Sequence, residues 1–157
     1  MDVSPSPESE PAAPEPAPIA AAEPAEPHAP HVVKVLVNAC VDFRFADALV
    51  DWLRAQGLHG AYDLRTHEGA ALAVDRWLES DVVLNRLHDV EAIWIVDHAD
   101  CGAYRLAGEP NTRENHVMHL KAARARVQAW VGKPVRIFYH PLGPDGRGAS
   151  TVEEITP

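Results

Sequence analysis

The sequence has few cysteines, no long apolar run and no excess of basic residues. Two cysteines among 157 residues are too few for a disulfide framework. No stretch approaches the roughly 18 apolar residues of a membrane span, and the N-terminus lacks the basic start and apolar run of a secretory signal. With 14 basic and 23 acidic residues, the net charge of −9 argues against binding to nucleic acid or to an anionic membrane. We therefore expect a cytoplasmic protein with reduced thiols.

Residues 1–31 differ in composition from the rest of the chain. They hold nine of the fourteen prolines and six acidic residues, but no Lys, Arg, Gly or aromatic residue. A segment this poor in apolar side chains cannot offset its chain entropy by burial, so the sequence predicts a disordered tail. The other 17 acidic and 14 basic residues lie in residues 32–157, which we expect to form one folded domain.

After the predicted tail, β-branched runs alternate with stretches of helical periodicity. The expected strands are residues 32–37, 61–66, 92–96 and 134–139, and the expected helices are 45–56, 70–87, 102–106 and a last one, capped by Asn111, that runs to about 131. Residues 141–157 are rich in Gly and Pro and are expected to be mostly loop, with a short segment near Val152. This alternation predicts an α/β fold, a three-layer α/β/α domain with a roughly four-stranded parallel sheet in the order 2-1-3-4.

Candidate ligands for a metal stand at the ends of the first and third predicted strands. In the predicted order these strands are neighbours, and the chain reverses direction between them, which is where such sheets bind ligands. Cys40 follows the first strand, and His98 and Cys101 follow the third. Two thiolates and one imidazole suit zinc, and three protein ligands leave a fourth position open. Asp42 can reach that position, and Arg44 can hold Asp42 in a bidentate ion pair.

Two short motifs carry these residues, CVDFR at residues 40–44 and HADCG at residues 98–102. In this order and at strand ends, they resemble the C-x-D-x-R and H-x-x-C-G motifs of the β-class carbonic anhydrases, above all the short, divergent members of that family. The resemblance covers about residues 32–140. It implies that Cys40, His98 and Cys101 bind zinc, which lowers the pKa of bound water from about 15.7 towards 7. The implied activity is the reversible hydration of carbon dioxide to bicarbonate by attack of the resulting hydroxide.

The resemblance also implies roles for the acidic and basic residues of the first motif. Asp42 would accept a hydrogen bond from the hydroxide on zinc and aim it, and Arg44 would hold Asp42. In a closed state Asp42 would ligate the zinc instead. A homodimer with a pocket shared between subunits is implied as well. The sequence departs from the family at residues 66–70, which replace its usual Arg-Asn-Ala-Gly stretch, and at residues 1–31, which replace its N-terminal helices.

Other interpretations of the same residues stay open at this point. The substrate can be a related small molecule, such as carbonyl sulfide or carbon disulfide. The zinc can be structural, in a non-catalytic interaction module. Cys40 and Cys101 can also be inert core thiols, and Asp42 with Arg44 can be an ordinary surface ion pair.

Three pairs of polar residues near the motifs have both a structural and a functional interpretation: Asp97 with Asp100, His116 with His119, and His67 with Glu68. The first pair would be turn or cap residues for the helix expected at residues 102–106, or either residue would orient His98. The second would pack along its helix, or carry a proton from the site. The third would fill a loop, or line the pocket. Tyr104 and the four tryptophans are expected in the core.

Overall fold

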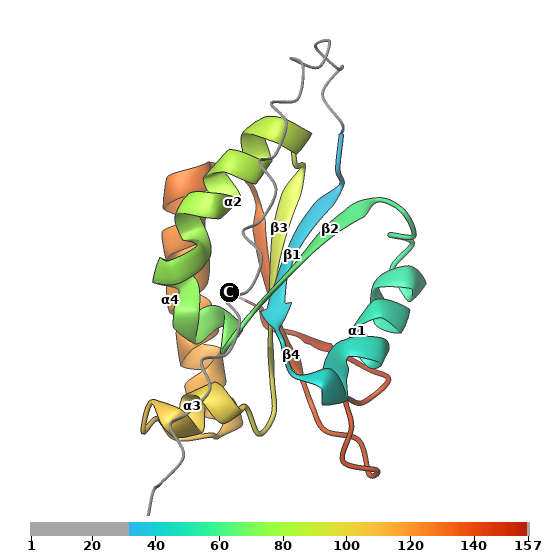
Figure 1. Cartoon of the computed structure of the whole chain (residues 1–157), viewed down its shortest axis with the longest axis vertical. Coiled ribbons are helices and arrows are strands. Elements are labelled where there is room, and N and C mark those ends of the chain that lie inside the picture. Colours follow the sequence, from blue (N-terminus) through green and yellow to red (C-terminus); the bar gives the residue numbers. More distant parts are fainter. Residues whose placement is uncertain (1–31, 157) are drawn as a thin grey trace, which may run out of the picture.

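The computed structural model describes residues 32–156 of the chain (Figure 1). The predicted tail, residues 1–31, lies outside the described residues, so its disorder and the domain boundary stay predictions. None of the helices in the described part has the length and apolar character of a membrane span. The elements in chain order are β1 (Val35–Cys40), α1 (Phe43–Ala55), β2 (Tyr62–His67), the 3₁₀ helix η1 (Ala70–Ala73), α2 (Val74–His88), β3 (Ala92–His98), α3 (Gly102–Leu106), α4 (Arg113–Val131), β4 (Val135–His140) and β5 (Glu153–Glu154).

The strands form one sheet in the order β2-β1-β3-β4-β5. The first four strands pair in parallel, which confirms the predicted fold class and the order 2-1-3-4. The prediction of four strands is incomplete, because β5 adds a fifth strand that pairs antiparallel with β4. A strand of two residues is too short to show the alternating pattern by which a strand is recognised in sequence, so β5 is defined by its tertiary contacts. Arg136 of β4 donates two hydrogen bonds to the Glu154 carboxylate, and Ile155 is buried in the core.

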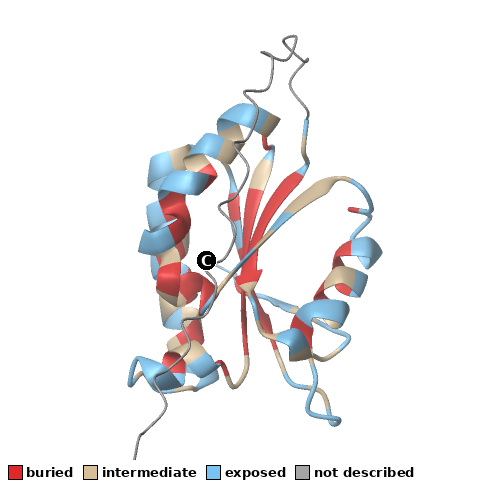
Figure 2. Ribbon diagram, in the orientation of Figure 1, coloured by how far each residue is buried: buried red, intermediate tan, exposed pale blue. Residues whose placement is uncertain are grey.

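Helices cover both faces of the sheet, giving the predicted three layers. Because successive side chains of a strand point to opposite faces, Val35 and Val37 of β1 join one core cluster and Leu36 joins the other. The first cluster includes the apolar stripe of α1, and the second includes η1 and the inner faces of α2 and α4. In Figure 1, α1 lies on one side of the sheet, and α2 and α4 lie on the other. Figure 2 shows the buried residues concentrated in the strands and along the inward sides of these helices.

Three local predictions are wrong. The single helix expected over residues 70–87 is two elements, because Gly69 takes a left-handed conformation and the chain makes a 3₁₀ turn before α2 begins at Val74. Thr112, not Asn111, caps α4, with its side-chain oxygen accepting a hydrogen bond from the backbone N–H of Asn115. Three tryptophans are buried as expected, but Trp130, in the last turn of α4, is 57% exposed.

Gly69 is the glycine whose replacement tests how closely η1 packs on α3. Its φ is +78°, and a Cβ there would lie 2.8 Å from the Cβ of Ala103. Gly60 is the matched control, because its φ is +69° and a Cβ there would meet nothing within 4 Å. We predict that Gly60→Ala lowers the free energy of unfolding by about 1–2 kcal/mol through backbone strain alone.

Gly69→Ala should cost a further ~1–3 kcal/mol, because η1 and α3 must also move apart to admit the methyl group. Urea unfolding of the two variants and the parent protein measures the difference. Equal losses in the two variants would contradict the close approach.

Candidate metal centre

Three side chains from two neighbouring strands converge at the carboxyl edge of the sheet. Cys40 is the last residue of β1, His98 is the last residue of β3, and Cys101 directly precedes α3. Parallel pairing of β1 with β3 brings the two strand ends together. The ligand atoms of the three residues all lie within 4.8 Å of one another, and the two sulfurs are 3.8 Å apart. The structure therefore brings together the three residues that the sequence predicts as ligands.

The imidazole of His98 has one nitrogen bonded and one available. Its Nδ1 lies 2.7 Å from the carbonyl oxygen of Ala99, which can only accept, so Nδ1 donates, and in the neutral ring Nε2 carries the lone pair. The Nε2 atom is buried and has no hydrogen-bond partner among residues 32–156. A buried polar atom without a partner is costly. A metal ion bound at Nε2 would remove that cost, so this side chain fits a ligand role.

The surroundings of the two sulfurs stabilise one negative charge, on Cys40. Hydrogen bonding from the Cys101 thiol, together with His98, holds the pKa of Cys40 well below its ordinary value, at about 4, despite burial. The pKa of Cys101 is raised, first by its bond to the Cys40 sulfur and then by burial. Backbone N–H groups also point at the sulfurs, from Gly69 to Cys40 and from Ala103 and Tyr104 to Cys101. A dication replacing the proton between the sulfurs would meet two sulfurs and an imidazole, a ligand set that zinc prefers.

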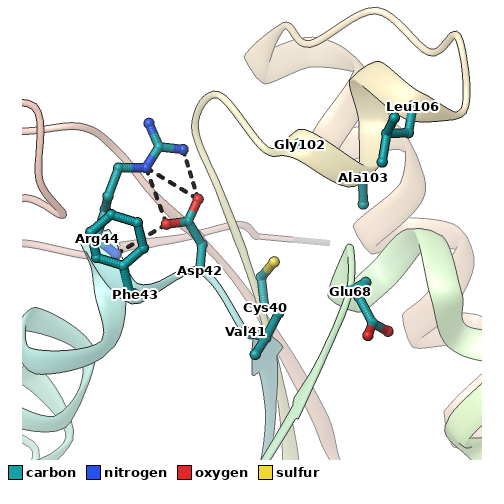
Figure 3. A pocket seen from close by; sticks show the side chains of 9 residues that line it. All are labelled: Cys40, Val41, Asp42, Phe43, Arg44, Glu68, Gly102, Ala103 and Leu106. Atoms are coloured by element: carbon teal, nitrogen blue, oxygen red, sulfur yellow. Dashed lines mark hydrogen bonds and ion pairs between the residues drawn. The ribbon is translucent and has the colours of Figure 1, made fainter. Parts of the chain in front are cut away.

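Asp42 and Arg44 form the predicted bidentate ion pair beside the cluster (Figure 3). The Nε atom of Arg44 lies 3.1 Å from Oδ1 of Asp42, and its Nη2 atom lies 2.6 Å from Oδ2. The Asp42 carboxylate also accepts the backbone N–H of Arg44 at 3.0 Å, capping α1. Hydrogen bonds from Arg44 hold the pKa of Asp42 below its ordinary value, so Asp42 is an anion at neutral pH. Its Oδ2 lies 4.0 Å from Nε2 of His98.

Asp100 is a partner of Arg44 that the sequence prediction missed. Nη1 of Arg44 donates to the Asp100 carboxylate and Nη2 donates to the Asp100 carbonyl oxygen, each at 3.0 Å. Asp100 is a turn residue, as expected, but its side chain neither caps α3 nor orients His98. Its φ of +53° turns the backbone between the two ligands of this loop. Arg44 thus ties the first motif to the second.

A pocket of about 530 Å³ opens above Cys40 and is bordered by both motifs (Figure 3). In Figure 3 the Cys40 sulfur points into the space between the Asp42–Arg44 pair and α3. Much of the wall is apolar and exposed, with Val41 at 56%, Phe43 at 76% and Leu106 at 92%. The remaining lining residues are Cys40, Asp42, Arg44, Glu68, Gly102 and Ala103. His98 and Cys101 lie behind this surface, with only 3% and 1% of their area exposed.

His67 and Glu68 have different roles. Glu68 lines the pocket, which was one of the two interpretations of this pair; the other was that the pair fills a loop. His67 turns away from it, stacks on Trp77 and lies 3.1 Å through Nε2 from Oδ1 of Asn38. The amide of Asn38 in turn donates to the buried carboxylate of Asp81 at 2.6 Å, and burial raises the pKa of that carboxyl to about 6. This chain of polar contacts fastens β1 to α2 beneath the pocket.

The other polar residues near the second motif face inward. Asp97 does not bond to His98; it accepts hydrogen bonds from Ala71 N–H and from Tyr104, which is in the core as expected. His116 is fully buried with Nδ1 3.0 Å from Asp97, and Nε2 of His119 lies 3.6 Å from Glu109. Neither histidine lines the pocket: the side chain of His116 is fully buried, and that of His119 is 22% exposed.

The lowered pKa of Cys40 predicts a distinctive reactivity for the metal-free protein. An ordinary thiol with a pKa near 8.5 should react with iodoacetamide roughly 75-fold faster at pH 8 than at pH 6, following its thiolate fraction. Because Cys40 is already a thiolate at pH 6, its rate should be nearly constant over this range. Buried Cys101 should stay unlabelled.

Mass spectrometry of the alkylated peptides gives both rates. Cys40→Ser is the control that removes the fast reaction. A Cys40 rate that rises with pH like that of a free thiol would contradict this electrostatic description.

Comparison with known proteins agrees with the architecture. Residues 31–139 match the family described as "Putative carbonic anhydrase". An uncharacterized protein of Rickettsia conorii is 30% identical over 127 residues, which cover 71% of this chain and 68% of the relative. The fold is similar to that of a carbonic anhydrase from Streptococcus mutans, with a TM-score of 0.56, 18% identity and coverage of 84% of this chain and 88% of that one.

A second solved structure has the same fold. The β-carbonic anhydrase isoform I of Trichomonas vaginalis gives a TM-score of 0.53 at 16% identity, covering 85% of this chain and 87% of that one. At these identities the structural likeness shows the fold, and the family match over residues 31–139 shows the relationship. The chain belongs to the family described as "Putative carbonic anhydrase", and its fold is similar to that of the two carbonic anhydrase structures.

Proposed function

We propose that this protein catalyses the zinc-dependent, reversible hydration of carbon dioxide to bicarbonate. One observation carries the proposal: the buried, unpartnered Nε2 of His98 lies beside two sulfurs 3.8 Å apart, at the base of a pocket walled by an Asp–Arg pair. Family membership supports the same conclusion, because the family is described as "Putative carbonic anhydrase".

Cys40, His98 and Cys101 would hold the zinc ion. Bound zinc would act as a Lewis acid that lowers the pKa of a water molecule towards 7. The lone pair of His98 faces the sulfurs because Ala99 fixes the other ring nitrogen. The backbone N–H groups around the sulfurs favour their thiolate forms. Cys40 therefore already favours the thiolate form that zinc needs, whereas the raised pKa of Cys101 means that zinc binding would displace a proton from that thiol.

Asp42 would orient the attacking water. As an anion it can only accept hydrogen bonds, so a water that donates to it directs its own lone pair elsewhere. Arg44 occupies both carboxylate oxygens and is itself fixed by Asp100, which holds Asp42 beside the cluster rather than on it. This geometry supports the open state of the site, in which Asp42 does not ligate the metal.

The pocket suits a small, uncharged and apolar substrate. Val41, Phe43 and Leu106 offer hydrocarbon surface near the Cys40 sulfur, and carbon dioxide needs little more than such a surface to bind. These side chains are exposed within one chain, so a second copy covering them would remove apolar surface from water. Each Å² of apolar surface buried in this way stabilises the dimer by about 25 cal/mol. The proposal therefore includes a homodimer, which sedimentation equilibrium measures directly. It also includes a cytoplasmic location, where thiols stay reduced.

Stopped-flow measurement of carbon dioxide hydration between pH 6.5 and 9 tests the proposed reaction. Zinc-loaded protein should be active, with a rate that rises with pH as water on the metal loses its proton. Cys40→Ser should be inactive. Asp42→Asn should lower kcat/KM by on the order of 10²-fold while zinc stays bound, because the amide can donate and no longer selects one water orientation.

Asp51→Asn is the matched control for the Asp42 variant. Asp51 lies on α1 and its carboxylate also pairs with an arginine, Arg54, but its side chain is 75% exposed and away from the pocket. This variant should keep the parent rate. Absence of activity at every pH, with one zinc bound per chain, would overturn the proposal and favour a related small substrate or a non-catalytic zinc module.

A further inference from the structure

The turn over residues 98–101, which carries two of the predicted metal ligands, is held by hydrogen bonds from one half-buried asparagine. Oδ1 of Asn111 lies 3.1 Å from the backbone nitrogen of Cys101, and Nδ2 lies 2.8 Å from the backbone oxygen of Cys101. A backbone N–H can only donate and a carbonyl can only accept, so the orientation of this amide is fixed. Asn111 therefore satisfies both backbone polar groups of a predicted zinc ligand.

His116 in turn holds the asparagine. Its Nε2 lies 2.8 Å from Oδ1 of Asn111, the oxygen that already accepts from Cys101, so Nε2 must be a donor. The other ring nitrogen, Nδ1, lies 3.0 Å from Oδ2 of Asp97 with one proton shared between them. The side chains of His116 and Asp97 are 0% and 1% exposed, so solvent does not compete for these bonds.

Asp97 anchors the network at the strand that carries the other loop ligand. It precedes His98 directly in β3, and it accepts hydrogen bonds from the backbone N–H of Ala71 in η1 and from the hydroxyl of Tyr104 in α3. Burial, with the nearby Asp97 charge, raises the pKa of Tyr104, so its hydroxyl remains a donor. One connected set of bonds thus links β3, η1, α3 and α4 to the turn between His98 and Cys101.

We propose that Asn111 and His116 are positioning residues for the metal centre, holding the Cys101 backbone where its sulfur meets His98 and Cys40. This inference rests on the zinc site of the proposed function. The turn needs such support because Asp100, between the two ligands, has a φ of +53°, which is unfavourable for a residue other than glycine. Arg44 holds the turn at Asp100 from the pocket side, and Asn111 holds it at Cys101 from the core side.

Competition with a chromophoric zinc chelator, using the full chain, measures the zinc Kd independently of activity. Asn111→Ala should raise this Kd about 10- to 100-fold, the usual effect of removing a partner of a metal ligand. Asn111 is half-buried in a loop, so this variant should fold. Far-UV circular dichroism of the zinc-free proteins should show unchanged helix content.

Two substitutions of His116 separate positioning from packing. The amide of a glutamine reaches about as far as Nε2, so His116→Gln can keep the bond to Asn111 and lose that to Asp97. An asparagine reaches about as far as Nδ1, so His116→Asn can keep the bond to Asp97 and lose that to Asn111. If the bond to Asn111 positions the turn, His116→Asn should raise the zinc Kd by at least tenfold and His116→Gln by clearly less.

His119→Gln is the control on the same helix. His119 also contacts the Tyr104 ring edge-on, but its polar contact is with Glu109 rather than Asn111, so the zinc Kd should stay within twofold of the parent value. Parent-like zinc binding by Asn111→Ala, or equal losses in the two His116 variants, would overturn the inference while leaving the zinc site intact. A parent protein that binds no zinc would overturn the proposed function, and this inference with it.

Discussion

The parallel pairing of β1 with β3 is the constraint on which the candidate site depends. It places Cys40 beside the end of the strand that carries His98, although 57 residues separate them in the chain. The pairing is itself a product of burial, since Leu36 and Ile95 face one core and Val37 and Trp94 face the other. The free energy of apolar packing on both sides of the sheet therefore offsets the loss of chain entropy when the two polar motifs are brought together. Each motif alone would place no more than two ligands.

Around that junction, the protein fixes the orientation of nearly every polar group by a second contact. Ala99 fixes the His98 ring, Arg44 fixes Asp42, and Asp100 fixes Arg44. These contacts differ in character on the two sides of the turn. On the pocket side they are charge-assisted and partly exposed, so salt and solvent weaken them. On the core side the contacts of Asp97 are fully buried and those of Asn111 are part-buried, so the loss of a partner of Asp97 is the more costly.

Much of this arrangement was accessible from the sequence, for identifiable reasons. Strands buried on both faces are nearly continuous runs of β-branched residues, and such runs can be recognised in a sequence. The alternation of strands with helices then restricts the topology of the sheet to few arrangements. The metal ligands stand out because the only two cysteines occur at strand ends. The short strand β5 gave no such signal, because its two residues are held by Arg136 and by burial of Ile155. The single helix expected over residues 70–87 and the burial expected for Trp130 were wrong, because a 3₁₀ turn precedes α2 and no part of the described chain covers Trp130.

The polar network was also beyond the reach of sequence. Asn111 precedes a helix and matches the pattern of a helix cap, yet the adjacent Thr112 does the capping and leaves Asn111 to bind Cys101. Asp97 and Asp100 are alike in sequence context, but one points into the core and the other toward Arg44. Local pattern identifies the residue types available, and only the packing of β3, α3 and α4 decides which partner each one meets.

X-ray absorption spectroscopy of the zinc-loaded protein tests the central claim most directly. The account predicts two sulfur ligands at about 2.3 Å and two lighter ligands at about 2.0–2.1 Å, one of which is His98 and the other not a residue of the cluster. In Cys101→Ser the sulfur count should fall to one. Zinc with no sulfur ligand, or with the same spectrum in the parent and in this variant, would contradict the assignment of Cys40, His98 and Cys101 as the metal centre.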